Sequence, residues 1–211
     1  MERVLCIIIG YLFGLIQSGY LYGRTKHMDI RQHGSGNAGS TNVLRVMGIK
    51  AAAIVYLGDF FKAVAAMTIA RLLFADSAAG TDLLAMYAGL GVTLGHNYPF
   101  YLGFKGGKGI ASMSGIFTAM DIRIALVCLV IFSTTVALTR YVSLGSILIS
   151  ITFCIMLIFF GNQGCYNVAP GCRMELYALV IILMGMAIWR HRANIKRLLS
   201  GTENKVGAKK A

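Results

Sequence analysis

Long runs of residues without charge divide this chain, and they constrain its fold more than any other feature. Two of them, Val4–Tyr22 and Tyr141–Phe160, contain 19 and 20 residues, which is about the length of helix that crosses the hydrocarbon core of a bilayer. None of the runs alternates apolar and polar residues as the strands of a membrane barrel do. The runs therefore predict an all-α polytopic membrane protein.

The composition supports this fold class and excludes three others. Apolar residues make up 57% of the 211 residues and charged residues only 13%, about half the charged share of an ordinary soluble domain. A soluble domain of this size could not bury so much apolar surface in one core, and intrinsic disorder requires low hydrophobicity. Five cysteines are too few for a small disulfide-stabilised scaffold.

Seven runs are candidate transmembrane helices, with five or six helices as the alternative count. Three runs are shorter than a straight span, and Gly109–Met120, with 12 residues, would rise only about 18 Å as a helix. We therefore expect about seven helices, some short or re-entrant, in a single domain over residues 1–211 with a loose tail from 202 to 211. In chain order the runs are Val4–Tyr22, Ala51–Phe74 (interrupted by Asp59, Lys62 and Arg71), Leu83–Phe104, Gly109–Met120, Ile124–Thr139, Tyr141–Phe160 and Leu176–Trp189.

The basic residues indicate the orientation of these helices. The chain has 20 Lys and Arg against 8 Asp and Glu, and membrane proteins carry such an excess on their cytoplasmic loops. With seven helices and the N-terminus outside, 15 basic residues lie inside and 4 lie outside, namely Arg3, Arg71, Arg123 and Arg173. We therefore expect an outer N-terminus and a cytoplasmic C-terminus. Nucleic-acid binding would also explain the net charge of +12, but it does not require this hydropathy.

The first polar stretch on the predicted inner side is Gly34–Arg45. Its glycines allow tight turns, in which successive N–H groups form an anion-binding concavity. The hydroxyl groups of Ser35, Ser40 and Thr41 add donors, and Arg45 adds a planar charged fork. The stretch is typical of a phosphate site and, equally, of a glycine- and serine-rich connection between helices.

The second stretch, Gly95–Gly109, places Lys105 and Lys108 among four glycines. A lysine supplies a compact positive charge for a phosphate group. Gly109 stands where a Walker motif requires Ser or Thr, which excludes a nucleotide-hydrolysing P-loop. Two lysines framed by glycines favour phosphate binding over a purely topological role for the charges.

The third stretch, Arg190–Glu203, follows the last run. On a helix, His191 and Asn194 are three positions apart and face the same side. Lys196 and Arg197 point elsewhere, where they would contact anionic lipid headgroups. Taken alone, this stretch is most simply a basic cluster that binds lipid and nothing more.

Charged and thiol groups outside these stretches raise two further questions. Asp59 and Lys62 lie three positions apart within a membrane run, where charges are costly and are usually paired or functional. A structural pair and a proton or ligand role are equally consistent with that spacing. Cys165 and Cys172 share an outer loop, so a disulfide is one alternative there.

No conventional catalytic set accompanies the polar stretches. The four histidines lack a metal-binding spacing, and no Gly-x-Ser-x-Gly elbow occurs. Only Asp29 and Glu203 are acidic on the predicted inner face, so a general base is hard to find. Ser, Asn, Lys and Arg instead suit the electrostatic stabilisation of anions.

Together, the segments Gly34–Arg45, Gly95–Ala111 and His191–Glu203 resemble the three motifs of the PlsY family, in the family's order and at comparable spacing. These are bacterial acyl-phosphate:glycerol-3-phosphate acyltransferases. The resemblance spans nearly the whole chain, and the Asp59–Lys62 pair also matches it. One departure is Leu15–Leu21, where Gln17 replaces the proline that the family often has.

The resemblance carries site residues over to this chain. Those that it implies to be catalytic are Ser35, Arg45, Lys105, Ser143, His191 and Asn194. Those that it implies to bind substrate are Gly36, Asn37, Gly39, Thr41, Asn42, His96, Asn97, Gly106, Gly107, Lys108, Gly109 and Glu203. No metal and no cofactor is expected.

The implied reaction moves a fatty acyl group from acyl-phosphate to the sn-1 hydroxyl of glycerol-3-phosphate, giving lysophosphatidic acid. The implied setting is the bacterial inner membrane, with the site facing the cytoplasm, membrane lipids around it and no nucleic acid. A functional link to a phosphate acyltransferase that produces acyl-phosphate is also implied. Two alternatives are a transporter or channel for a phosphorylated anion, where a transporter would place its site near the membrane midplane, and a structural subunit that binds anionic lipid.

Overall fold

The computed structural model describes residues 1–207, and within them every regular element is helical. Apolar runs form the long helices because a helix satisfies all of its backbone polar groups internally. The helices are α1 (Glu2–Gly14), α2 (Ser18–Thr25), α3 (Ser40–Met47), α4 (Ile49–Leu73), α5 (Thr81–Asn97), α6 (Ile110–Met120), α7 (Ile122–Thr139), α8 (Val142–Asn162), α9 (Arg173–Arg190) and α10 (Arg192–Leu199). Short 3₁₀ turns lie at Ile30–Gln32, Phe100–Leu102 and Pro170–Cys172.

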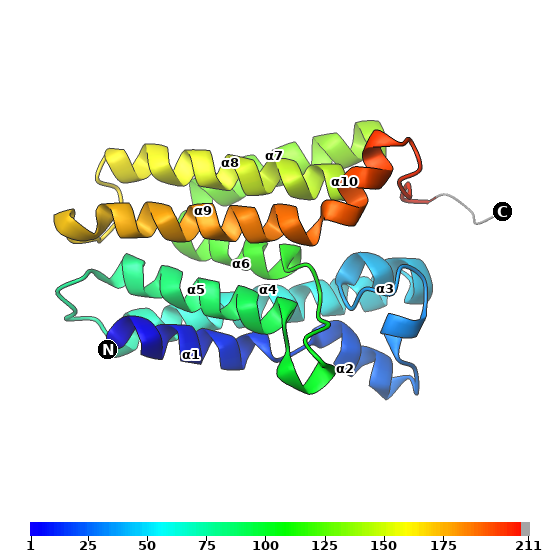
Figure 1. Cartoon of the computed structure of the whole chain (residues 1–211), viewed down its shortest axis with the longest axis horizontal. Coiled ribbons are helices and arrows are strands. Elements are labelled where there is room, and N and C mark those ends of the chain that lie inside the picture. Colours follow the sequence, from blue (N-terminus) through cyan, green and yellow to red (C-terminus); the bar gives the residue numbers. More distant parts are fainter. Residues whose placement is uncertain (208–211) are drawn as a thin grey trace.

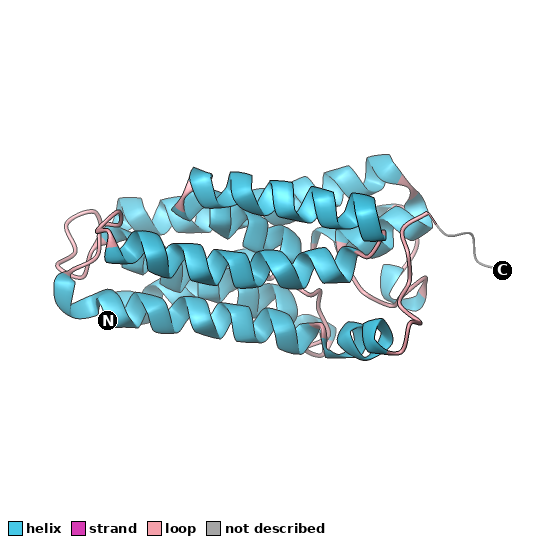
Figure 2. Cartoon of the chain, turned by 90° about the horizontal axis from the view of Figure 1, so that it is seen from above, coloured by secondary structure: helices cyan, strands magenta, loops and turns pink. Residues whose placement is uncertain are grey.

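The long helices run side by side as an elongated bundle (Figures 1 and 2). One end carries α2, α3, α10 and the connections 26–39, 98–109, 140–141 and 191–207, and we call it the motif end. The N-terminus lies at the opposite end (Figure 1). The three polar stretches therefore share one end of the molecule, as the distribution of basic residues predicts.

Five helical segments within residues 1–207 are long and apolar enough to cross a membrane. They are Glu2–Thr25, Ile49–Leu73, Ile122–Thr139, Val142–Asn162 and Pro170–Arg190. Two further helices are shorter, α5 with 17 residues and α6 with 11. The all-helical membrane class is confirmed, and the expectation of short helices agrees with α6.

The first predicted helix is broken, which corrects the continuous run Val4–Tyr22. Helix α1 ends at Gly14, and α2 begins at Ser18. The side chain of Gln17 fills the break: its Nε2 donates to the backbone carbonyls of Gly14, Gly95 and His96 at 3.1, 3.3 and 3.0 Å. The amide thus satisfies carbonyl groups that a helix end leaves free.

Helices α1 and α5 pack closely through glycines. A Cβ atom on Gly10 would lie 2.0 Å from the Ala88 carbonyl oxygen, and one on Gly91 would lie 2.2 Å from that of Ile7. Gly14 and Gly95 follow each of these by one helical turn and are equally confined. Small residues at this spacing let two membrane helices approach backbone to backbone. The contact fixes the end of α5, and hence the second polar stretch, against α1.

Candidate active site

A pocket of about 400 Å³ opens at the motif end, and residues of all three polar stretches line it. Its walls come from α3, α4, the beginning of α6, and α7, α8 and α10. Thirteen of the residues expected at the site are in this lining: Ser35, Asn37, Gly39, Thr41, Asn42, Arg45, His96, Lys108, Gly109, Ser143, His191, Asn194 and Glu203.

The first stretch is a loop built around Asn42. Oδ1 of Asn42 accepts hydrogen bonds from the backbone N–H and the hydroxyl of Ser35 at 2.7 and 3.0 Å. Its Nδ2 donates to the carbonyls of Ile30 and His33 at 3.2 and 2.9 Å. Asn42 is 1% exposed, so its amide holds the loop in shape and Ser35 at the pocket rim.

Donors for an anion converge on this rim. Gly39 is the N-cap of α3, which places the first turn of that helix, with Ser40 and Thr41, on the pocket. A helix N-terminus presents free N–H groups and the positive end of the helix dipole. Arg45, one turn into α3, also lines the pocket, and its guanidinium makes no hydrogen bond or ion pair with the described residues.

The second stretch folds back over the end of α5. The N–H groups of Gly106 and Gly107 donate to the carbonyls of Asn97 and His96 at 3.2 and 3.1 Å. Nη2 of Arg190 donates to the carbonyls of Gly106 and Gly107 at 2.9 and 2.7 Å. Gly109 then caps α6 in a left-handed conformation (φ 84°). The loop is therefore pinned on both sides, with Lys108 directed to the pocket.

Glu203 organises the third stretch. Its Oε1 accepts from Nδ2 of Asn194 at 2.7 Å and from the hydroxyl of Ser143 at 3.0 Å. Its Oε2 accepts from Nε of Arg197 at 2.8 Å. The carboxylate is buried and has three donors, so it orients its neighbours. Asn194 Oδ1 in turn accepts from Nζ of Lys108.

Two expectations for this region are corrected. Arg197 does not point away to lipid headgroups, because it pairs with Glu203. Residues 202–207 are not loose: beyond the Glu203 contacts, the N–H of Val206 donates to the Arg140 carbonyl at 2.9 Å, and Arg140 Nη2 donates to the Val206 carbonyl at 2.7 Å. The remainder of the expected tail, residues 208–211, lies outside the described residues.

Lys108 has an unusual electrostatic environment. Burial, supported by the guanidinium groups of Arg197, Arg45 and Arg190, lowers the pKa of its ammonium to about 8, although Glu203 acts in the opposite direction. Loss of solvation disfavours the charged form of a lysine. A phosphate group bound in the pocket would give this ammonium group a negatively charged partner.

His191 is held as a neutral imidazole. Its Nδ1 lies 2.8 Å from the Ala187 carbonyl oxygen, which can only accept, so Nδ1 carries the proton. Burial and the Lys108 charge lower the pKa of His191 to about 4. The bare Nε2 is then a hydrogen-bond acceptor in the pocket lining, and a weak base.

Five of the expected residues lie elsewhere. Lys105, Gly36 and Gly106 line a second, polar hollow with Asp29, Arg31 and Arg190, and Lys105 is exposed. Gly107 lies against His96, so that a Cβ there would be 2.1 Å from His96 Nε2. Asn97 is fully buried, and its side-chain amide has no partner among residues 1–207. The structure therefore separates Lys105, which lines the second hollow, from Lys108, which lines the pocket.

The sequence reasoning missed an apolar wall of the pocket. Ile49, Ala52, Ala53 and Tyr56 of α4 face Phe132 and Val136 of α7 across it. Their spacing on α4, at i, i+3, i+4 and i+7, is the signal of a single helix face, but an apolar face in a membrane helix does not distinguish a pocket from a packing surface. The sequence predicts for Arg190 only a position on the inner side. It does not predict that Arg190 holds the glycine loop, because the two are distant in the sequence.

The structure also places the charged and thiol groups that lie outside the three stretches. Asp59 and Lys62 form a buried ion pair at 2.7 Å, below the pocket. Cys165 and Cys172 are both free thiols. Among the described residues, no group of three His, Cys, Asp or Glu side chains is placed to hold a metal ion.

Comparisons with known proteins cover almost the entire chain. The model of the glycerol-3-phosphate acyltransferase family matches residues 4–201. The glycerol-3-phosphate acyltransferase of Thermoanaerobacter sp. (strain X514) is 44% identical over 210 residues, covering 99% of this chain and 98% of that protein. That of Clostridioides difficile (strain 630) is 44% identical over 210 residues, covering 98% and 97%.

A solved structure agrees with these relatives. The crystal structure of PlsY (YgiH), an integral membrane glycerol 3-phosphate acyltransferase, in its glycerol 3-phosphate form has a TM-score of 0.84 to this chain at 34% identity, covering 98% of this chain and 96% of that one. Its lysophosphatidic acid form gives a TM-score of 0.83 at 33% identity. Because sequence and structure agree from end to end, the resemblance carried by the three polar stretches is confirmed, and the chain belongs to the glycerol-3-phosphate acyltransferase family of integral membrane enzymes.

Proposed function

We propose that this enzyme transfers a fatty acyl group from acyl-phosphate to the sn-1 hydroxyl of glycerol-3-phosphate, releasing phosphate and lysophosphatidic acid. One observation carries the proposal: a single pocket combines cationic and N–H donors with an apolar wall. Phosphorylated substrates need the first feature, and an acyl chain needs the second. The relatives' names and the two forms of the PlsY crystal structure support the acceptor and the product.

The phosphate groups bind at the rim of the pocket. Arg45, Lys108 and the first turn of α3 supply positive charge and N–H donors there. Such preorganised donors stabilise charge that develops in a transition state without reorganisation of solvent. Since the leaving group of an acyl-phosphate is phosphate itself, neutralisation of its charge promotes departure without a protein acid.

The bond changes need no protein base. The sn-1 hydroxyl oxygen attacks the acyl carbon, the bond from that carbon to the phosphate oxygen breaks, and the hydroxyl proton passes to a phosphate oxygen. The described carboxylates at the motif end are all occupied: Asp29 by Arg31, Asp59 by Lys62, and Glu203 by Ser143, Asn194 and Arg197. We assign to the bare Nε2 of His191 the role of accepting a hydrogen bond from the acceptor substrate.

The acyl chain lies along α4. Ile49, Ala52, Ala53 and Tyr56 follow one face of α4 from the rim, opposite Phe132, and Ile49 and Tyr56 are exposed at the surface of the bundle. Ala52 and Ala53 leave space for a chain between α4 and α7. The apolar wall thus places the acyl carbon near Lys108 and His191 while the methylene groups stay out of water.

Several finer features belong to the same proposal. The chain is a single domain with seven crossings, its N-terminus outside and its motif end in the cytoplasm of a bacterial inner membrane. A phosphate acyltransferase that makes acyl-phosphate would supply the donor. The excess of Lys and Arg in the connections of the motif end supports this orientation. The pocket is lined by residues of α3 and α10, which lie at one end of the bundle (Figure 1), and this position argues against the transporter alternative.

The test is an assay of the purified protein with glycerol-3-phosphate and either acyl-phosphate or acyl-coenzyme A. We expect lysophosphatidic acid and inorganic phosphate in equal amounts from acyl-phosphate, and no product from acyl-coenzyme A. Comparable turnover with acyl-coenzyme A would overturn the donor assignment. Glycerol-3-phosphate uptake into proteoliposomes without acyl transfer would instead establish the transporter.

A further inference from the structure

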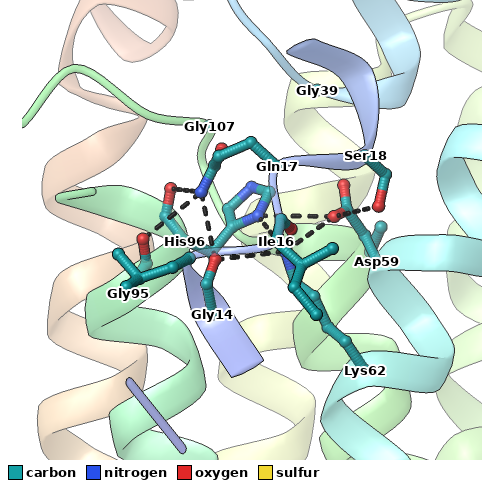
Figure 3. A network of polar contacts seen from close by, with 12 residues as sticks. Gly14, Ile16, Gln17, Ser18, Gly39, Asp59, Lys62, Gly95, His96 and Gly107 are labelled. Carbon is teal, nitrogen blue, oxygen red and sulfur yellow. Dashed lines mark hydrogen bonds and ion pairs between the residues drawn. The ribbon is translucent and has the colours of Figure 1, made fainter. Parts of the chain in front are cut away.

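A buried polar network lies beneath the pocket and joins three helices (Figure 3). Asp59 and Lys62 of α4 are 1% and 5% exposed, and His96 near the end of α5 is 2% exposed. Asp59 Oδ1 also accepts from the hydroxyl of Ser18 at 3.0 Å, at the start of α2. Asp59 and His96 both reach the lining of the pocket.

The donors of Lys62 can be counted. An ammonium group has three N–H donors and no acceptor. Lys62 Nζ has three close partners: the Ile16 carbonyl at 2.6 Å, Asp59 Oδ1 at 2.7 Å and His96 Nδ1 at 2.8 Å, with the Gly14 carbonyl farther away at 3.4 Å. Every donor is therefore used, and one of them requires a lone pair on His96 Nδ1.

This contact decides which nitrogen of His96 carries the proton. A proton on Nδ1 would point at the ammonium, so the imidazole is neutral with its proton on Nε2. Nε2 lies beside the glycine loop, since a Cβ on Gly107 would be 2.1 Å from it. Among residues 1–207 this N–H has no hydrogen-bond partner. A free N–H donor thus stands one residue from Lys108, at the floor of the pocket.

We propose that Asp59 and Lys62 are positioning residues for the acyl transfer reaction: they hold His96 in the Nε2–H tautomer, so that it donates to an oxygen of the bound phosphorylated substrate. The inference rests on the proposed function for the identity of that substrate. It assigns the two pocket histidines opposite roles. His96 donates through Nε2, whereas His191, with its proton on Nδ1, accepts through Nε2.

A purely structural role makes a different prediction. Lys62 also satisfies the Ile16 carbonyl at the break between α1 and α2, and a residue needed only for that purpose would affect folding without acting through His96. The Asp59→Asn/Lys62→Met double variant distinguishes the roles, because it removes both charges together and leaves no unpaired buried ion.

The first measurement is the ¹⁵N spectrum of histidine-labelled protein in detergent, with His96 assigned from the His96→Gln variant. In the unchanged enzyme we expect one protonated and one bare ring nitrogen for His96, and a shift of the protonated signal when glycerol-3-phosphate is added. In the double variant we expect mixed tautomers. An unaltered His96 pattern in a folded double variant, or no response to glycerol-3-phosphate in the unchanged enzyme, would overturn the proposal.

The second measurement is kinetic. By analogy with residues that orient a functional histidine, the double variant should lose about 10- to 100-fold in kcat/KM. When the same double substitution is added to His96→Gln, kcat/KM should fall almost no further, because the effect of the double substitution acts through His96. If the losses in kcat/KM from the two sets of substitutions multiply, Asp59 and Lys62 have a structural role that is independent of His96. If no acyl transfer occurs from acyl-phosphate while the tautomer result holds, the proposed function fails and the positioning role stands.

A matched control lies on the same two helices. Arg71 of α4 pairs with Asp82 of α5 at 2.8 Å, at the end opposite the pocket. The Arg71→Met/Asp82→Asn variant also removes an ion pair, one that is partly exposed and joins the two helices. It should leave both kcat/KM and the His96 signals unchanged, and a loss equal to that of the Asp59/Lys62 variant would attribute the effect to general destabilisation of the bundle.

Discussion

Lys108 is the side chain whose charge should set the pH dependence of the reaction. Its pKa is lowered to about 8, so it is charged below that pH and progressively neutral above it. Because the proposed role requires the ammonium, kcat/KM should be level below pH 8 and fall above it. The pH profile with a soluble acyl-phosphate checks this. A rise in kcat/KM through pH 8 would show that the neutral amine acts as a base.

The basic residues differ in what their loss should cost. Removal of Arg45 or Lys108 from the pocket should lower kcat by about 10²-fold or more, as for other groups that stabilise transition-state charge. Arg45→Lys should recover only part of the rate, because it keeps the charge and loses the two-pronged fork. Steady-state kinetics of each variant provides the measurement.

Exposed lysines are the controls for that series. Lys205 lies over the Tyr141 ring at 5.5 Å and is not among the residues that line the pocket, so Lys205→Ala should have a kcat close to that of the unchanged enzyme. The equivalent expectation for Lys209 and Lys210 falls on residues outside the described part of the chain. Lys105→Ala should cost less than Lys108→Ala, since Lys105 lines the second hollow. Equal losses at Lys205 and Arg45 would favour a general basic surface over a specific site.

At the scale of the helices, the sequence predicts where each helix lies better than it predicts whether that helix is unbroken. Apolar runs locate every long helix because a membrane helix must be apolar over most of its length. The break at Leu15–Gln17 was not predictable, since a run without charge is equally compatible with a straight helix. It is stabilised by Gln17 through carbonyl groups of α5 that lie 78 and 79 positions away in the sequence.

The α1–α5 contact gives a prediction about stability. A methyl group at Gly91 would meet the Ile7 carbonyl oxygen at 2.2 Å, so Gly91→Ala must separate the two helices. Overpacking of this kind costs about 1–3 kcal/mol. Gly185 of α9 has no neighbour within 4 Å of such a methyl group, and Gly185→Ala should leave the melting temperature unchanged. Thermal unfolding in detergent compares them, and equal melting temperatures would contradict the close contact.

At the scale of the whole molecule, the sequence predicts that the three polar stretches meet, and it does not predict which of their side chains face the pocket. Charge distribution assigns all three to one end. The division between Lys108 and Lys105 depends on how Arg190 pins the glycine loop. The role of Asn42 in holding its loop likewise depends on a carbonyl of the preceding 3₁₀ turn, that of Ile30. Spacing alone carries no information about such contacts.

The same molecule provides a test of orientation in the membrane. Cys165 is an exposed, free thiol at the end opposite the pocket, and Lys196 of α10 is exposed at the motif end. If the motif end is cytoplasmic, a membrane-impermeant maleimide added to spheroplasts should label Cys165 at once. A thiol introduced by Lys196→Cys, in a chain with Cys165→Ser and Cys172→Ser, should react only after the membrane is opened. Cys6, Cys128 and Cys154 are buried and should contribute no background. Labelling of Lys196→Cys from outside, with Cys165 protected, would invert the topology and place the phosphate site on the wrong side for a cytoplasmic substrate.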